Sequence, residues 1–176
     1  MIGLVSGQLV GEKPQIKIGF LVNPIAGMGG SVGLKGTDNV LEEAQKLGAT
    51  KIAPEKAKRF LKKFYELCDK NILEKILWLT VNGEMGENEI RETRYEIRNT
   101  RYEIRDTRYE IRDTKYEIRN MDNYNIIYNT QIEETTATDT KNACQAFVEN
   151  DVVLIVFCGG DGTARDIYEI IHDTIP

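Results

Sequence analysis

The strongest chemical signal in the chain is the segment GGDGT at residues 159–163, which follows an apolar run at residues 152–158 and precedes a helix expected from about Ala164. Glycines let a backbone turn sharply and approach a phosphate group closely, and the first amides of a helix offer free N–H donors at its positive end. The hydroxyl of Thr163 can donate a hydrogen bond or cap the helix. The segment is therefore predicted to bind phosphate.

Asp161 is an unusual residue for such a loop, because a carboxylate repels phosphate. Its presence is explained if it binds a metal ion, accepts a proton from an attacking hydroxyl, or does both. We therefore predict that Asp161 is a catalytic residue and a candidate ligand of Mg²⁺. The alternative is a Gly-Asp-Gly turn that only caps a helix, and the buried strand expected before it disfavours that alternative.

A second glycine-rich loop, NPIAGMGG at residues 23–30, follows the apolar run IKIGFLV. It does not match the dinucleotide-binding pattern G-x-G-x-x-G, because Gly27 and Gly29 fit its start but the third glycine is Gly33. The sequence also lacks the pattern G-x-x-x-x-G-K-[ST] of ATP-binding P-loops. Alone, this loop is weak evidence for any ligand.

The two loops together predict a phosphate cleft if the strands before them end at the same edge of one sheet. Lys35 and Thr37 follow the first loop and could reach into such a cleft. For Lys35 an exposed surface position explains the sequence equally well, since most lysines are exposed.

Strand and helix patterns alternate along the chain, which predicts an α/β fold with a doubly wound, mainly parallel sheet and ligand sites at the carboxyl ends of its strands. The apolar patterns place strands at 16–22, 76–81, near 126–128 and at 152–158, and helices at about 40–47, from 54, from 136 and from 164. Two helices have predicted buried faces, formed by Ala57, Phe60, Leu61, Phe64, Leu67 and Cys68 and by Ala143, Phe147 and Val148.

Residues 94–120 form a near-exact heptad repeat of the type RYEIRDT. A coiled coil needs apolar residues three and four apart, whereas Tyr102 and Ile104 are two apart. In a helix, Arg101 and Arg105 would also repel each other. We therefore expect small antiparallel strands or a disordered segment, inserted outside the core at about residues 88–120. A surface insertion without a binding role explains the repeat better than a binding array does.

The strings NPIAGMGGSVGLKGTD and FCGGDGTARD resemble the ATP-NAD kinase family, within the broader group of diacylglycerol kinases and 6-phosphofructokinases. They are especially similar to the branch that includes the acetoin-catabolism protein AcoX. The similarity covers roughly residues 16–90 and 122–176 and omits the repeat.

This resemblance implies transfer of a phosphoryl group from ATP, or from inorganic polyphosphate, to the ribose 2′-hydroxyl of NAD with Mg²⁺ as cofactor. Asp161 then takes the family's aspartate role. The residues implied to contact phosphates or to shape the cleft are Asn23, Gly27, Gly29, Gly30, Gly159, Gly160, Gly162 and Thr163. Such catalysis consists mainly of positioning and charge neutralisation.

Family members continue into a β-rich C-terminal domain that carries an Asn-Glu pair, whereas this chain ends at Pro176. We therefore expect an extension at residues 1–15, one α/β domain at 16–176, and weak or no activity of the isolated chain. The alternatives are a lipid or sugar kinase of the same fold and a non-catalytic nucleotide-binding or interaction module. Homo-oligomers are common in the family.

Composition favours a globular protein that has no nucleic-acid or membrane partner. Of the 176 residues, 41% are hydrophobic and 29% charged, and the net charge of -5 argues against binding to nucleic acid or anionic lipid. The N-terminal stretch lacks the positive flank of a signal peptide, so we expect a cytoplasmic location. The three widely spaced cysteines predict reduced thiols.

Overall fold

The computed structural model describes residues 15–33, 41–103, 123–130 and 135–176. These residues form a four-stranded sheet of order β3-β2-β1-β4, in which every pair of neighbouring strands is parallel. The strands are β1 (Ile16–Val22), β2 (Ile76–Val81), β3 (Tyr124–Tyr128) and β4 (Leu154–Cys158). The predicted α/β class with a doubly wound parallel sheet is confirmed.

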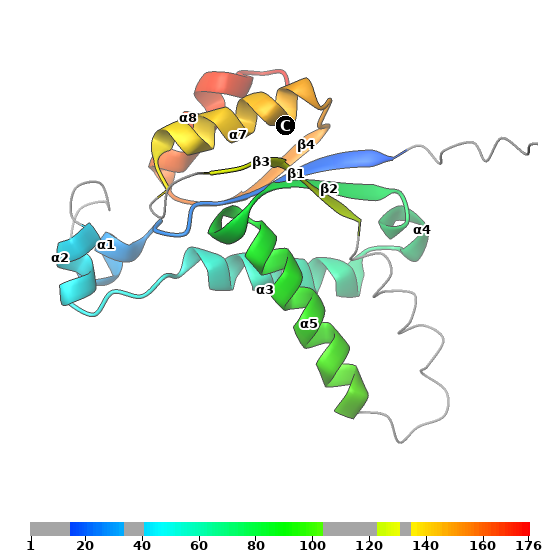
Figure 1. Cartoon of the computed structure of the whole chain (residues 1–176), viewed down its shortest axis with the longest axis horizontal. Coiled ribbons are helices and arrows are strands. Elements are labelled where there is room, and N and C mark those ends of the chain that lie inside the picture. The colour runs from blue at the N-terminus through cyan, green and yellow to red at the C-terminus, as the bar shows by residue number, and fades with distance from the viewer. Residues whose placement is uncertain (1–14, 34–40, 104–122, 131–134) are drawn as a thin grey trace, which may run out of the picture.

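Helices cover both faces of the sheet (Figure 1). On one face lie α3 (Ala53–Leu67) and α5 (Glu87–Glu103), and on the other lie α7 (Ala137–Glu149) and α8 (Asp161–Ile171). The shorter elements are α1 (Met28–Ser31), α2 (Leu41–Lys46), α4 (Lys70–Leu73) and the 3₁₀ helix η1 (Gly83–Met85). None of the helices in the described ranges has the length and apolar composition needed to cross a membrane.

The sheet is most deeply buried at β2, where all six residues are buried. Both helix layers contribute to this burial: Trp78 belongs to the cluster under α3, and Leu79 belongs to the cluster under α7 and α8. Because β2 is covered on both faces, its sequence is a continuous apolar run instead of an alternating one.

The strand predicted at residues 152–158 is present as β4, but it is shorter and less buried than expected. The strand begins at Leu154, and within the described residues it pairs only with β1, so it lies at an edge of the sheet. Leu154 and Phe157 are each 38% exposed. High hydrophobicity alone therefore did not indicate a central position.

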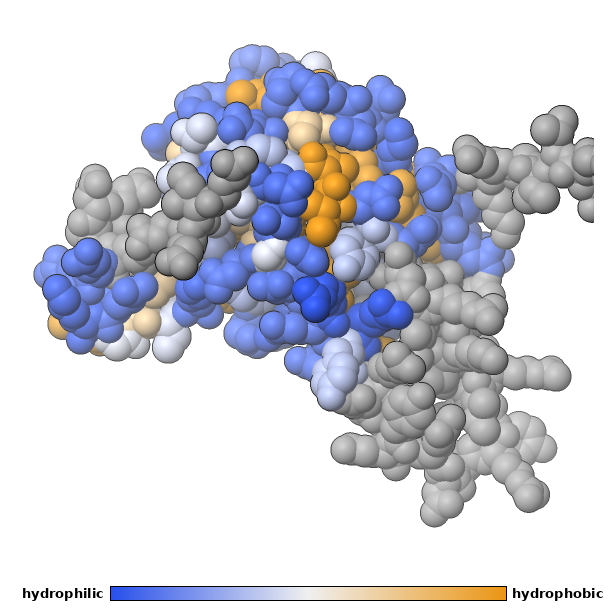
Figure 2. Space-filling view, viewed as in Figure 1, coloured by the Kyte–Doolittle hydropathy of each residue, from blue (hydrophilic) through white to orange (hydrophobic). Residues whose placement is uncertain are grey.

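The opposite edge of the described sheet is β3. Figure 2 shows a largely hydrophilic face, on which hydrophobic surface gathers mainly where Figure 1 draws β3. Ile126 of this strand is 39% exposed. This strand is therefore only partly covered by the helices.

The predicted buried faces of the two long helices need one correction each. Leu67 at the end of α3 is 74% exposed and Val148 of α7 is 36% exposed, whereas Tyr65 is buried. The hydroxyl of Tyr65 accepts a hydrogen bond from Nε1 of Trp78 at 2.9 Å, so a polar tip is satisfied inside the core.

The expectation that the repeat is not helical is wrong for residues 94–103, which belong to α5. Glu92 and Glu96, two like charges four residues apart on α5, each have a partner on α3. Lys58 of α3 lies 3.0 Å from Glu92, and Lys62 forms an ion pair with Glu96. These contacts connect α5 to α3 and stabilise it.

The start of α5 packs in the core, since Ile90 and Thr93 are fully buried. Ile97 packs against the same cluster. An inserted segment therefore remains a prediction only for the repeat beyond α5, and residues 104–120 lie outside the described residues.

Candidate functional site

The two glycine-rich loops leave the sheet at the same edge. β1 and β4 are parallel neighbours in a register that pairs Val22 with Cys158. The backbone N–H of Asn23 donates to the carbonyl of Cys158 at 2.8 Å. Since both loops begin at this pair of strand ends, the sheet brings residues 23–30 and 159–163 together.

A direct side-chain hydrogen bond joins the loops. Nδ2 of Asn23 donates to Oγ1 of Thr163 at 2.9 Å. Each partner is also fixed by a backbone amide, because Oδ1 of Asn23 accepts from the N–H of Ile25 at 3.2 Å and Oγ1 of Thr163 accepts from the N–H of Gly160 at 3.4 Å. Asn23 and Thr163 are thus held in one orientation by both loops.

Gly159 is required by close packing. A Cβ at this position would lie 2.6 Å from the Cβ and Cγ2 of Thr163. Gly160 and Gly162 differ, since a Cβ at either would meet nothing within 4 Å. The loop is therefore tightly packed at Gly159 and open to its surroundings at Gly160 and Gly162.

The open side of this loop is the N-terminus of α8. Gly160 is the N-cap and Asp161 is the first helical residue, so the first amides of the helix have no acceptor within it. Asp161 and its neighbouring glycines are exposed, whereas Thr163 is buried. The arrangement offers N–H donors and a helix dipole to an anion, with one carboxylate beside them.

The loop after β1 has two buried side chains, those of Pro24 and Met28. Gly27 has φ of 80° and is the N-cap of the short helix α1, a conformation that favours glycine. Met28 is buried and Gly30 faces open space. Gly29 is buried, so the amide groups near Gly27 and Gly30 are the more accessible part of this loop. Lys35 and Thr37 lie outside the described residues.

Asp161 is the single carboxylate in the two loops, and no group of three or more His, Cys, Asp or Glu residues that could hold a metal ion occurs among the described residues. This fits Mg²⁺ bound through one carboxylate and the phosphates of a ligand, because Mg²⁺ keeps several waters and seldom uses an all-protein cage. It does not fit a structural metal centre.

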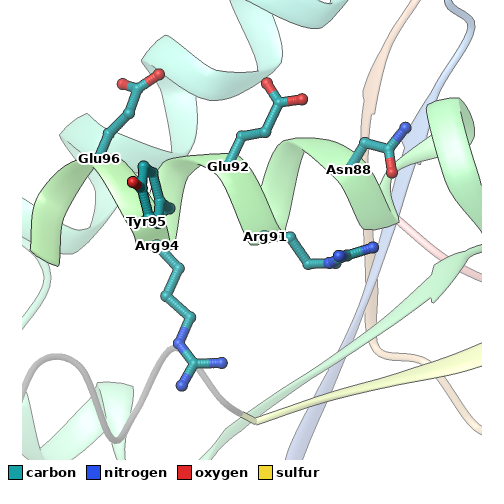
Figure 3. A pocket seen from close by; sticks show the side chains of 6 residues that line it. All are labelled: Asn88, Arg91, Glu92, Arg94, Tyr95 and Glu96. Atoms are coloured by element: carbon teal, nitrogen blue, oxygen red, sulfur yellow. The ribbon is translucent and has the colours of Figure 1, made fainter. Parts of the chain in front are cut away.

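A cavity of about 800 Å³ lies elsewhere, along the outer side of α5. Figure 3 shows that the carboxylates of Glu92 and Glu96 point to one side of the helix and that Arg94 points away from them. The residues that line it are Asn88, Arg91, Glu92, Arg94, Tyr95 and Glu96. None of the predicted site residues that the structure describes lines this cavity.

Sequence reasoning missed a buried carboxyl group near the strand ends. Glu89 of α5 is 4% exposed, and burial raises its pKa to about 7. It contributes to the raised pKa of Cys158, the residue that precedes the GGDGT segment. An α-helical pattern starting at Glu87 would have placed Glu89 beside Ile90 and Thr93 on the face turned to the core.

All three cysteines are free thiols; Cys144 is buried, and Cys68 and Cys158 are partly buried. The helix predicted from residue 136 begins with a capping box, in which Oδ2 of Asp139 accepts from the N–H of Thr136 at 2.9 Å.

Comparison with known proteins gives one match. The model of the ATP-NAD kinase N-terminal domain matches residues 18–176. Searches of curated proteins and of solved structures gave no significant match. The matched range contains both glycine-rich loops and all four strands except the first two residues of β1. The chain therefore belongs to the family of the ATP-NAD kinase N-terminal domain.

Proposed function

We propose that this chain is an NAD kinase-type phosphotransferase domain that binds ATP and NAD at the edge of the sheet where β1 and β4 end. The hydrogen bond between Asn23 and Thr163 is the observation that carries the proposal, because it holds two phosphate-binding loops against each other. Family membership supports kinase chemistry and nucleotide binding. Within the family, the motif strings favour the branch that includes AcoX.

Phosphate groups are bound by the backbone in this proposal. The open backbone at Gly160 and Gly162 lets phosphate oxygens reach the N–H groups at the start of α8. Gly27, Gly29 and Gly30 shape the opposite wall, and Asn23 fixes the distance between the walls through Thr163. Lys35 and Thr37 stay predicted contacts of the same ligand.

Asp161 acts on the attacking hydroxyl. Its carboxylate accepts the proton of the ribose 2′-hydroxyl as the oxygen forms a bond to phosphorus and the bond to the leaving-group oxygen breaks. When bound, Mg²⁺ supplies positive charge that neutralises the phosphate oxygens. Asp161 is also the residue that would hold this ion, together with phosphate oxygens and water.

The test combines ligand binding with turnover in the full chain. Wild-type protein is titrated with ATP, Mg²⁺ and NAD, and NADP formation is measured with ATP and with polyphosphate as donors. The wild type should bind nucleotide and turn over weakly. Asp161→Asn should keep nucleotide binding and lower any measurable rate by about 10²–10⁴-fold, the usual contribution of a general base.

Asp166→Asn is a matched control, because Asp166 lies on the same helix but pairs with Lys141 at 3.5 Å. It should leave both binding and rate unchanged. An Asp161→Asn variant with wild-type turnover would contradict the role of Asp161. Absence of nucleotide binding by the wild type would contradict the loops as a phosphate site.

A further inference from the structure

Glu89 and Thr93 carry two buried oxygen atoms that make no hydrogen bond among the described residues. Glu89 is 4% exposed and Thr93 is fully buried. Oε2 of Glu89 and Oγ1 of Thr93 have no partner. The residues are four apart on α5, so their side chains lie on the same side of the helix. A buried polar atom without a partner is costly and calls for an explanation.

The charges around Glu89 do not compensate a carboxylate. Glu92 of α5 and Glu84 of η1 act on it as like charges, and Lys58 of α3 acts as the opposing charge. Lys58 is already shared, since its Nζ lies 2.6 Å from Glu55 and 3.0 Å from Glu92. Cys158 of β4 is a further titratable neighbour: burial raises its pKa, Glu89 raises it further, and Lys56 lowers it. An uncharged carboxyl group suits this surrounding better than an ionised one.

The position of Glu89 connects it to the phosphate loops. Cys158 ends β4 directly before Gly159, and its carbonyl accepts the hydrogen bond from the N–H of Asn23. α5 starts just after η1, which packs against both β1 and β2. A charge that appears at Glu89 therefore acts on the strand ends from which both loops begin.

We propose that Glu89 is a proton-dependent part of the core, uncharged while α5 is packed, and that its ionisation loosens α5 from the cluster that Ile90 shares with Val22 of β1 and Cys158 of β4. Glu89 thereby makes the order of the phosphate loops depend on pH. This pH dependence does not require that the loops bind any particular phosphate ligand.

The direction of the pH effect follows from proton binding. The carboxyl has its ordinary pKa of 4.5 in the unfolded chain and a pKa of about 7 in the fold. Between these values the folded state holds more protons, so stability is greatest below pH 4.5, falls as pH rises and levels off above about pH 7.

The first test compares wild type with Glu89→Gln, which keeps the shape and cannot ionise. Denaturant unfolding is measured from pH 4.5 to 8.5. The unfolding constant of the wild type, relative to that of Glu89→Gln, should rise by about tenfold or more across this range. Glu96→Gln is the control, because Glu96 is on the same helix with a side chain that is 42% exposed; the unfolding constant of the wild type relative to that of Glu96→Gln should stay flat. A flat ratio of wild type to Glu89→Gln would overturn the proposal.

A second measurement does not depend on the folding of a variant. The side-chain carboxyl carbon of Glu89 in the wild type is followed by ¹³C NMR. A titration midpoint well above 4.5 supports the proposal, and an ordinary midpoint overturns it.

Coupling to the loops is tested by hydrogen exchange. At pH 8 the amides of residues 159–163 should exchange several-fold faster in wild type than in Glu89→Gln. Equal rates would overturn the link between Glu89 and the loops. Because this readout needs no nucleotide, it fails or succeeds separately from the proposed kinase activity.

Discussion

Asn23 and Thr163 are 140 residues apart in sequence and are joined by a side-chain hydrogen bond of 2.9 Å. The bond connects the loop after β1 to the first turn of α8. Had these loops left the sheet at opposite ends, they could not have shared a phosphate. The parallel pairing of β1 with β4 places them together, as a ligand-binding crevice at the carboxyl ends of an open α/β sheet requires.

Removing this bond should weaken the coupling between the loops. Asn23→Ala and Thr163→Val each destabilise the fold, and a double-mutant cycle should give a coupling energy of about 0.5–1.5 kcal/mol, the net value of a typical hydrogen bond. Urea unfolding measures it. Asn23→Ala combined with Thr174→Val is the control, because Thr174 bonds to Ile171 at the far end of α8, and these two changes should be additive. Additivity of the Asn23 and Thr163 changes would mean that the bond does not hold the loops.

Gly159 and Gly162 should respond differently to alanine. Gly159→Ala places a Cβ 2.6 Å from the Thr163 side chain, and such overpacking costs about 1–3 kcal/mol. Gly162→Ala meets no atom within 4 Å and gains helix propensity, so its stability should equal or slightly exceed that of the wild type. Thermal unfolding distinguishes the variants. Equal destabilisation of both would show that the loop does not pack as described.

The central strands could be predicted from sequence because their signals are local. Residues 16–22 and 76–81 are continuous apolar runs with turn residues at their ends, and the structure has both strands with the same bounds. The edge position of β4 could not be predicted this way, because it depends on which strands pair and not on the hydrophobicity of residues 152–158. The same limit applies to Leu67, which is apolar but lies at the last residue of α3.

The two loops of the candidate site could be predicted from the sequence, but helix α5 could not. Asn23 and Thr163 belong to short motifs whose chemistry can be inferred from residue type. Glu89 and Thr93 gain their meaning from burial in α5, and the helix itself was missed because its charges were weighed only within one segment. The stabilising partners Lys58 and Lys62 are on α3, more than thirty residues earlier in the sequence.

The buried contact between Tyr65 and Trp78 predicts a large effect from a single oxygen atom. Tyr65→Phe removes the acceptor of the Trp78 Nε1–H group and leaves this donor buried without a partner, which costs about 1–3 kcal/mol. Trp78 is the only tryptophan, so its fluorescence follows urea unfolding directly. Tyr95→Phe is the control, since Tyr95 is 66% exposed, and it should change stability little. Equal stability of Tyr65→Phe and wild type would contradict a buried hydrogen bond.

Cys144 should resist alkylation as long as the protein is folded. Burial raises the pKa of its thiol to about 12, and the nearby Asp166 adds to the shift. Because the thiolate is the reactive form, only about one molecule in 10⁴ would be reactive at pH 8 even with full access of the reagent. Cys68 is partly exposed and should react first with iodoacetamide, as measured by mass spectrometry of peptides. Adding urea should bring the two rates together, since unfolding gives both thiols their ordinary pKa. Alkylation of Cys144 at the rate of Cys68 in native buffer would mean that α7 opens readily from the sheet, because only such opening exposes this thiol and lowers its pKa.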